Sequence, residues 1–490
     1  MSYNNIQQTS LEQDFNSQLE KLDEQRAKRM QNQVETTLET IAAKVKDCQT
    51  EILRIKSEQK SWKTFLLNFL SGEIVRLFDG RLTVPNYSPR DKAEQDVFLF
   101  VGTHWVQLPR PCYFGTIVKL ARSMGLPDAD GCQPAFMNLL FEQVAFRVSC
   151  FRNEIVPNDE AWLNVENGTL EIKGNGSIVF REHRRDDFFQ YVLPYHYDAR
   201  EQCPKWRRFL DQMLPDADTQ KVLAEYVGYC FTRGIKAEKM LVLHGSGSNG
   251  KSVVLDVIEA LMGTANVSNV GLSELTEKEE KCAMLENKLV NISHESGREL
   301  STAKLKQLVS NEPVVVRRLY QNSHSMTCYA KLITSFNVLP KAEQTHGFFR
   351  RFIIVPFEQT VTESEMDVDL AKKLCGELPG ILNWVLEALR EFVVRRAFTQ
   401  SQVCKDALLH YRHLSDSVLL FIEEKCEVTE QCEKPGKDLY PAYKNYCMES
   451  GLRYLGKNIF FEQLKSHGIL QAEKHHVLFF NLKLTEENEW

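Results

Sequence analysis

The segment MLVLHGSGSNGKS, at residues 240–252, decides the fold of this chain. Its first four residues are apolar and predict a buried strand, and the glycine-rich loop after them fits the pattern G-x-x-x-x-G-K-[ST]. The apolar run 253–261 predicts a helix directly behind the loop. A strand, this loop and a helix in succession indicate a P-loop, whose backbone N–H groups and positive helix end surround phosphates. The loop residues are Gly245, Ser246, Gly247, Ser248, Asn249, Gly250, Lys251 and Ser252.

The last two loop residues carry the charge and the hydroxyl that a nucleoside triphosphate needs. The ammonium of Lys251 would neutralise the β- and γ-phosphates of ATP, and the Ser252 hydroxyl would be a ligand of the Mg²⁺ that bridges them. The alternative is a glycine-rich turn without a nucleotide, which the flanking strand and helix disfavour. ATP and Mg²⁺ are therefore the expected cofactors.

Strand-like runs at 288–292, 331–334 and 352–355 alternate with helical segments, which predicts an α/β fold. Glu295 and Asn337 follow the first and second of these runs. Because the carboxyl ends of parallel strands meet at one edge of a sheet, both are expected beside the P-loop. Glu295 is the candidate base for the attacking water and a second Mg²⁺ ligand, and Asn337 is a candidate γ-phosphate contact. The alternatives are a surface glutamate and a turn-forming asparagine.

Two adjacent arginines, Arg350 and Arg351, precede the aromatic strand-like run that begins at Phe352. A guanidinium that reaches the ATP of a neighbouring subunit stabilises the charge of the transition state, as an arginine finger does. Adjacent residues of an extended chain point in opposite directions, so only one of the two is expected in that role. The alternative is an ordinary ion pair.

The order of P-loop, glutamate, asparagine and arginine between Gly245 and Arg351 resembles a superfamily 3 helicase. Further segments resemble the phage, plasmid and poxvirus primase-helicases over about residues 95–490, namely Asn164-Val165-Glu166-Asn167-Gly168, Leu193-Pro194-Tyr195, Cys203-Pro204, Gly228-Tyr229 and the P-loop itself. This resemblance implies a hexameric AAA+ ring that draws in single-stranded DNA. It matches Glu295 to the Walker B glutamate, Asn337 to the sensor and, best of the two arginines, Arg351 to the finger.

The resemblance also implies a DNA-gripping hairpin before the sensor strand, where this chain has residues 317–324. Ring stacking and positive charge both serve single-stranded nucleic acid. The candidate contacts are Arg317, Arg318, Tyr320 and His324. The chain departs from the pattern twice, because the hairpin lacks the usual lysine and Ser293-His294 replaces an acidic residue beside the glutamate. A surface hairpin without a ligand is the alternative.

The predicted organisation is a P-loop AAA+ motor with appended parts. Residues 10–60 lack proline and glycine and read as one long helix, with an apolar seam of period ~3.5 from Val34 to Ile55 that suits a coiled coil or packing on the chain itself. Asn167-Gly168 predicts a β-hairpin. The expected divisions are a helical extension at 1–60, a pre-motor α+β domain at 61–202, a helical collar at 203–236, the motor at 237–400 and a winged-helix-like domain at 401–490.

Bulk composition excludes several classes of protein. The net charge of −6 gives no global attraction to phosphate, so a nucleic-acid site must be local. The 13 cysteines include no C-x-x-C pair, and the nearest metal candidate, Cys426 and Cys432 with His410 and His413, lacks the usual ligand spacing. No stretch approaches the roughly 20 apolar residues of a membrane span. We therefore expect reduced thiols, no membrane contact and a location in the cytoplasm of a host cell.

The predicted function is that of a replicative DNA helicase of a mobile element or virus, acting on single-stranded or forked DNA as a ring-forming homo-oligomer. The N-terminal helix is a candidate docking arm for a replication protein. No separate primase motif is visible, so we expect no primer synthesis. Two alternatives stay open: an AAA+ assembly or loading factor, and an origin-binding initiator that uses ATP only to oligomerise.

Overall fold

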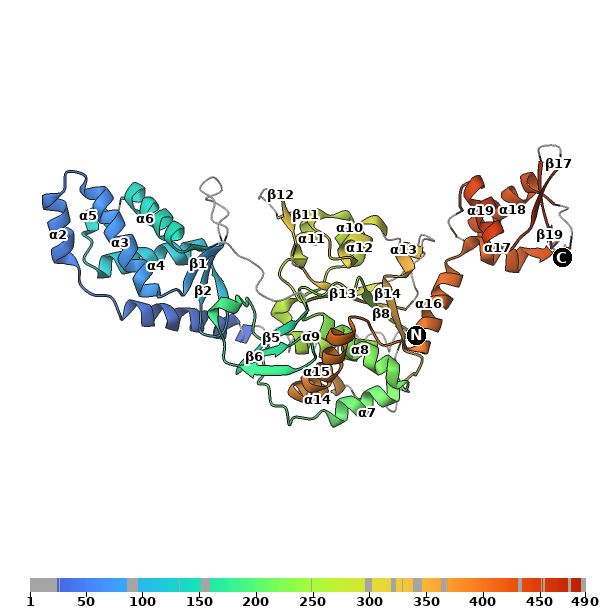
Figure 1. The fold of residues 1–490 in the computed structure, drawn as a ribbon, viewed down its shortest axis with the longest axis horizontal. Coiled ribbons are helices and arrows are strands. Elements are labelled where there is room, and N and C mark those ends of the chain that lie inside the picture. Colours follow the sequence, from blue (N-terminus) through green and yellow to red (C-terminus); the bar gives the residue numbers. More distant parts are fainter. Residues whose placement is uncertain are drawn as a thin grey trace, which may run out of the picture.

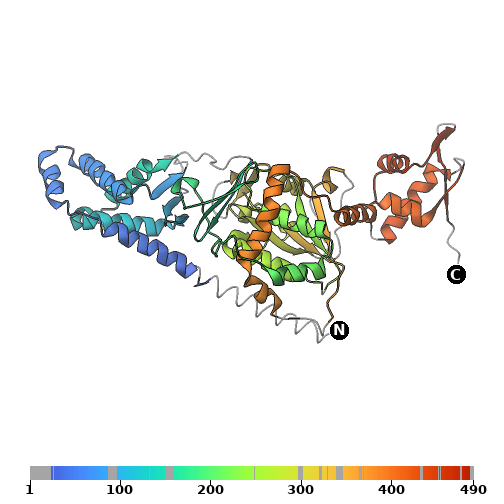
Figure 2. The same cartoon turned by 60° about the horizontal axis from the view of Figure 1, so that its bottom comes forward.

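The structure is a computed structural model in which the chain forms separate bodies along one long axis (Figure 1). It describes residues 24–25, 27–85, 96–131, 133–150, 159–247, 249–295, 302–318, 323–327, 329–337, 346–362, 367, 369–430, 434–450, 452, 454–474 and 477–485. A mainly helical N-terminal lobe lies at one end and a small C-terminal unit at the other. The body with the P-loop lies between them (Figure 2).

The predicted single helix over residues 10–60 is wrong within the described residues. A helix over 27–42 ends in a turn, and α2 (Gln49–Glu58) begins only after an irregular segment at 45–48. The break is fixed by tertiary contacts, because the backbone N–H of Cys48 donates to the Met124 carbonyl at 2.9 Å. The first 23 residues of the chain lie outside the described residues.

The apolar seam packs within the chain. Val34, Ile41, Ile52 and Ile55 are buried in one core with α3 (Trp62–Phe78), α4 (Arg110–Ser123) and α6 (Pro134–Arg147). The surface that a coiled coil would need is therefore already covered, and the expected division at residue 60 falls inside one hydrophobic core.

The same lobe contains a four-stranded sheet whose order is β3-β2-β1-β4. Its strands are β1 (Leu82–Pro85), β2 (Val97–Phe100), β3 (Trp105–Leu108) and β4 (Ser149–Cys150). The short helix α5 (Asp128–Gly131) connects α4 to α6. The helices and this sheet together give the lobe mixed α and β structure, in keeping with the α+β domain expected over residues 61–202.

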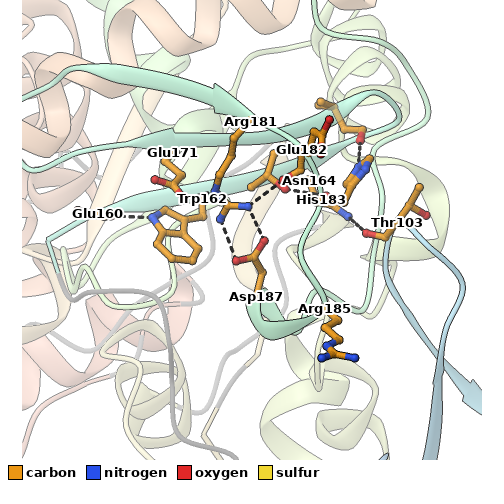
Figure 3. A network of polar contacts seen from close by, with 12 residues as sticks. Thr103, Glu160, Trp162, Asn164, Glu171, Arg181, Glu182, His183, Arg185 and Asp187 are labelled. Carbon is orange, nitrogen blue, oxygen red and sulfur yellow. Dashed lines mark hydrogen bonds and ion pairs between the residues drawn. The ribbon is translucent and has the colours of Figure 1, made fainter. Parts of the chain in front are cut away.

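The hairpin predicted at Asn167-Gly168 is confirmed. The antiparallel strands β5 (Ala161–Val165), β6 (Gly168–Ile172) and β7 (Ile178–Arg181) form a sheet between the lobe and the central body. Figure 3 shows Arg181 directed at Asp187, to which it donates two hydrogen bonds of 2.7 and 2.8 Å. Asn164 donates to the Thr103 carbonyl at 3.0 Å and so ties this sheet to the lobe.

The central body confirms the predicted α/β fold. Its five-stranded sheet has the order β14-β8-β13-β10-β9, and every neighbouring pair is parallel. The strands are β8 (Met240–His244), β9 (Val267–Ser268), β10 (Val290–Glu295), β13 (Lys331–Phe336) and β14 (Phe352–Pro356). Since the strands are parallel, their carboxyl ends lie along one edge.

Helices from both sides of the P-loop segment pack together beside this sheet. They are α7 (Pro204–Met213), α8 (Ala217–Tyr229), α9 (Lys251–Met262), α14 (Leu370–Cys375) and α15 (Leu378–Arg395). Helices α8 and α15 approach closely at Gly228, where a Cβ would lie 2.8 Å from the Cβ of Leu389. The predicted collar at 203–236 thus packs against α14 and α15, which follow the last strand of the central sheet.

The remaining elements of the central body are α10 (Leu272–Glu277), α11 (Glu279–Cys282), α12 (Thr302–Val309), α13 (His346–Phe349) and the hairpin of β11 (Val314–Arg317) with β12 (Ser323–Met326). Helix α16 (Gln402–Leu414) also belongs here, because its Tyr411 is buried against Phe349 and Phe352. The expected division at residue 400 therefore separates α16 from the sheet that it covers.

The C-terminal unit has its own core around Phe421, Tyr443, Phe460 and Phe480. It contains α17 (Ser417–Lys425), α18 (Gly436–Glu449) and α19 (Lys457–Ser466), followed by the antiparallel pair β17 (Gln471–Lys474) and β18 (Val477–Phe480). Two short strand pairs, β15 (Cys426–Val428) with β19 (Leu482–Leu484) and β16 (Lys434–Pro435) with β18, complete it. Within the described part of the chain, no helix has the length and apolarity needed to cross a membrane.

Candidate functional site

The P-loop connects β8 to α9 through backbone conformations that glycine allows. Gly247 has φ 112° and Gly250 has φ 78°, and α9 begins at Lys251 directly after the second of these. Non-glycine residues rarely adopt such angles, so these two glycines allow the loop to turn back over the start of the helix. Ser248 lies outside the described residues.

Asn249 fastens the loop from within. Its side chain is buried, its Nδ2 donates to the Phe357 carbonyl at 2.9 Å, and its Oδ1 accepts from Lys251 Nζ at 2.9 Å. Lys251 Nζ also donates to the Gly245 carbonyl at 2.6 Å. Burial lowers the pKa of Lys251, because removal from water disfavours the charged form. The ammonium is thus held under the loop by two neutral acceptors, and no carboxylate of the described residues forms an ion pair with it.

The loop fits a chain of phosphate groups. Helix α9 is twelve residues long, and its N-terminal end lies at the loop. The space over the loop is open, because a Cβ placed on Gly247 would meet no atom within 4 Å. Open space, unpaired helix N–H groups and a cation in one place suit phosphate. Ser252 is exposed beside the buried Lys251, so its hydroxyl is available to a divalent cation. These residues fit a nucleotide with Mg²⁺.

The strand register brings the predicted polar residues to the same edge. Phe336 of β13 lies opposite both His244 of β8 and Glu295 of β10. Asn337, which is exposed, follows Phe336 directly. The backbones of Glu295 and Asn337 therefore lie along the edge from which the P-loop begins, whereas the side chain of Glu295 lies outside the described part of the structure.

Polar contacts hold β10 and β13 together just before this edge. The Ser293 hydroxyl donates to Thr334 Oγ1 at 3.1 Å, and His294 Nδ1 lies 2.9 Å from Ser335 Oγ. Burial, followed by repulsion from Lys251, lowers the pKa of His244 at the neighbouring strand end. The neutral imidazole form is therefore favoured beside the P-loop.

The two candidate finger arginines lie at the opposite edge of the sheet. They precede β14, whose first residue, Phe352, is opposite Met240 at the start of β8. The five residues of β8 rise by roughly 3.3 Å each, so about 13 Å of strand separates this edge from the P-loop. Neither arginine therefore belongs to the P-loop edge of this chain.

The environments of the two arginines differ. The Arg351 side chain is 13% exposed, and its guanidinium donates to Ser310 Oγ at 2.8 and 3.1 Å and to the Gly347 carbonyl. The Arg350 side chain is 55% exposed, and Glu238 lies 3.4 Å from it. In this conformation Arg350 is the more accessible guanidinium, and Arg351 is held by contacts within the chain.

The candidate DNA-binding residues of the β11–β12 hairpin differ in exposure and in their partners. Arg318 donates to Glu286 at 2.6 Å, and His324 lies 3.1 Å from the same carboxylate. Arg317 is exposed. Tyr320 lies outside the described residues. The hairpin therefore offers Arg317 directly, whereas Glu286 holds Arg318 and His324 on the tip side of the strand pair.

Sequence reasoning named Asn249 only as a loop position and did not identify Glu238, Glu286 or Ser310. Each acts through a partner distant in the chain, such as Phe357 for Asn249 and Arg351 for Ser310. The sequence Gly247–Ser252 predicts the loop, but it does not predict that Asn249 donates to the carbonyl of Phe357.

Three segments of the chain match known families. Residues 95–215 match the family described as D5 N terminal like, and residues 413–482 match the family described as Poxvirus D5 protein-like. Residues 243–351, which contain the P-loop edge and both finger candidates, match a family of unknown function, DUF5906.

Curated relatives come from large DNA viruses. "Putative helicase 121R" of Invertebrate iridescent virus 3 is 22% identical over 66% of this chain and 39% of its own length. "Putative helicase L207/L206" of Acanthamoeba polyphaga mimivirus is 22% identical over 60% of this chain and 33% of its own. "Putative primase C962R" of African swine fever virus (isolate Warthog/Namibia/Wart80/1980) is 24% identical over 39% and 21%. The chain thus spans about a fifth to two fifths of the length of these relatives.

Among solved structures, the A form apo structure of the NrS-1 C terminal region is similar over 84% of this chain and 98% of that chain. The sequence identity is 10% and the TM-score is 0.43.

Proposed function

Because the chain carries D5-type segments and is homologous to viral helicases and primases, we propose that it is an ATP-driven DNA helicase of viral or mobile-element replication. It forms a ring, moves along single-stranded DNA and acts in the cytoplasm of the host cell. The observation that carries this proposal is the division of the nucleotide machinery between two edges of one sheet. The P-loop, Glu295 and Asn337 lie at one edge and the arginines at the other.

Each subunit binds ATP at its P-loop edge. Lys251 neutralises the β- and γ-phosphates, and the Ser252 hydroxyl holds Mg²⁺, which supplies further positive charge to the same phosphates. Glu295 orients and deprotonates the attacking water and would be a second ligand of the Mg²⁺. Asn337 contacts the γ-phosphate. The support for these roles is the strand register and the exposure of Ser252 and Asn337.

The neighbouring subunit completes the site. An arginine about 13 Å of strand away from its own P-loop acts on a nucleotide only when another subunit presents one. Guanidinium groups stabilise the charge that develops on a transferring phosphoryl group. The resemblance assigns this role to Arg351, whereas the greater exposure of Arg350 favours Arg350. We treat the pair as two alternatives that one experiment separates.

The other parts serve the ring. The central body is an AAA+ motor with α7 and α8 as its collar, and the C-terminal unit is a winged helix that contains the β17–β18 pair. The β11–β12 hairpin contacts the DNA strand through Arg317, joined by Arg318, Tyr320 and His324 when the hairpin moves. The exposed face of the helix over 27–42 binds a replication protein.

Trans-complementation tests the shared site. Lys251→Ala removes a subunit's own nucleotide site but keeps its arginines, and Arg350→Ala or Arg351→Ala does the reverse. We expect each protein alone to have little DNA-stimulated ATPase activity when its altered residue is essential. Co-expression of Lys251→Ala with the essential arginine variant restores activity, because one intact composite site forms at their interface.

The control is co-expression of Lys251→Ala with the double variant Glu295→Gln/Arg350→Ala, which cannot form an intact site. Displacement of a labelled strand from forked DNA is measured in parallel. A wild-type protein that stays monomeric with ATP and DNA and still hydrolyses ATP at full rate contradicts the proposal. Stimulated ATPase activity without strand displacement favours the loading factor instead.

A further inference from the structure

A basic pocket lies at the edge of the central sheet opposite the P-loop. Its volume is about 600 Å³, within the range of roughly 300–1,000 Å³ that ligand sites occupy. Arg233 and Lys236 line it from the segment between α8 and β8, and Arg396 lines it from the end of α15. About 13 Å of β8 separates this pocket from the P-loop, so the two sites are distinct.

The other walls of the pocket are the two ends of the β11–β12 hairpin. Asn311 and Pro313 precede β11, and Thr327 follows β12. Whatever occupies the pocket therefore touches the root of the element that is proposed to grip DNA. This placement connects the pocket to the DNA path and not to the subunit's own nucleotide.

The positive charges of Arg233, Lys236 and Arg396 have few carboxylates near them. Within the described ranges, no ion pair joins Arg233 or Lys236 to a carboxylate, and Arg396 lies 3.9 Å from Asp159 across an exposed contact. Glu312, between two of the wall residues, is exposed. Three cations at one concave surface attract a phosphate group through charge and hydrogen bonding.

The residues that line the pocket favour binding of the phosphate group of a nucleotide over binding of its base. The described lining side chains include no aromatic ring on which a base would stack. Cations with an amide and a hydroxyl, here Asn311 and Thr327, recognise backbone oxygens independently of sequence. A motor that moves along any sequence requires this kind of contact.

We propose that this pocket is a second phosphate-binding site, in which Arg233, Lys236 and Arg396 hold a phosphodiester group of the DNA strand at the root of the β11–β12 hairpin. The inference rests on the proposed helicase function. It adds a DNA contact at the root of the hairpin, so that the strand is bound both at the hairpin tip and at its root.

The test is fluorescence anisotropy of labelled oligothymidylate with the full chain at several salt concentrations. The variant is Arg233→Gln/Lys236→Gln, and the control is Lys46→Gln/Lys119→Gln, which removes the same charge from exposed positions of the N-terminal lobe. We expect about tenfold weaker DNA binding for the pocket variant only. Its plot of log affinity against log salt becomes shallower by about 0.7, since the pocket holds one phosphate group and each lost phosphate contact on a single strand removes about 0.7.

Binding of a fluorescent ATP analogue distinguishes the two sources of phosphate. The proposal requires unchanged nucleotide affinity in the pocket variant, and a loss of nucleotide binding with unchanged DNA binding overturns it in favour of a nucleotide phosphate. Should the double variant fold poorly by circular dichroism, Arg396→Gln, at a 60% exposed side chain, provides the same comparison.

The failures of the two proposals are distinguishable. Wild-type protein that binds oligothymidylate normally, together with a pocket variant of equal affinity and salt slope, overturns the pocket alone. Wild-type protein that binds no single-stranded DNA overturns both.

Discussion

At the scale of single residues, Asn249 connects the P-loop to the strand end at β14. Its amide bonds both the Phe357 carbonyl and the Lys251 ammonium inside the protein. The consensus pattern leaves this position free, yet the structure gives it two buried hydrogen bonds. The position of the lysine therefore depends on a neighbouring strand as well as on the glycines.

We expect Asn249→Ala to weaken binding of a fluorescent ATP analogue about tenfold and to lower the free energy of unfolding by about 1–3 kcal/mol, because a buried carbonyl and an ammonium each lose a partner. Nucleotide titration and urea unfolding measure the two effects. The control is Ser246→Ala, at an exposed loop position. Equal behaviour of the two variants would show that the asparagine does not position the loop.

His104 gives the N-terminal lobe a pH-dependent stability. Burial, and then repulsion from His183, lowers the pKa of His104 to about 4. Below the ordinary histidine pKa of 6.5, His104 is protonated in the unfolded chain but stays neutral in the folded chain. The free energy of unfolding therefore falls as the pH drops from about 6.5 to about 4.

Between pH 7 and pH 5 this single group removes about 2 kcal/mol of the free energy of unfolding. Urea unfolding at the two pH values measures the loss, and His104→Gln should reduce it by that amount. His413→Gln, at an exposed histidine, should leave it unchanged. A loss of the same size in the His104 variant would rule out this source.

At the scale of elements, the apolar seam of the N-terminal helices is packed within the lobe core. Ile41 is 2% exposed in the lobe core. We expect Ile41→Ala to lower the free energy of unfolding by about 2–5 kcal/mol, since it leaves a cavity among packed side chains. The oligomeric state, measured by light scattering, should not change.

Glu39→Ala, at an exposed position of the same helix, is the matched control and should be nearly neutral. If Ile41→Ala dissociates an oligomer without destabilising the lobe, the seam is an intermolecular contact after all.

The success of sequence reasoning depended on how local the signal was. The strand–loop–helix succession at residues 240–262 and the Asn167-Gly168 hairpin are set by a few consecutive residues, and both local structures are confirmed. The resemblance to the primase-helicases is confirmed by the two D5-type matches. The break at residues 43–48 was missed because it depends on the Met124 carbonyl, which is distant in the chain. The hold of Ser310 on Arg351 is equally non-local.

At the scale of the whole molecule, the C-terminal unit is separable from the central body only beyond α16. Tyr411 is buried against Phe349 and Phe352, and the core of the C-terminal unit begins at α17. We expect a chain ending at residue 414 to keep its ATPase activity, and a chain ending at residue 400 to lose stability because aromatic surface of the motor becomes exposed.

The two truncations are compared by thermal unfolding and by ATPase assay without DNA. Loss of activity in the longer truncation would mean that the C-terminal unit takes part in the nucleotide site. Equal stability of the two would mean that α16 is a linker and contributes no packing.

The Tyr195 hydroxyl donates to the Leu261 carbonyl at 2.8 Å, near the last turn of α9. The helix is therefore a rod of twelve residues, about 18 Å long, with the P-loop at one end and the β5–β7 side of the molecule at the other. A tilt of about 5° at the loop end displaces the far end by about 1.6 Å. We therefore expect a change of position at the P-loop end of α9 to be felt at its far end, where Tyr195 contacts Leu261.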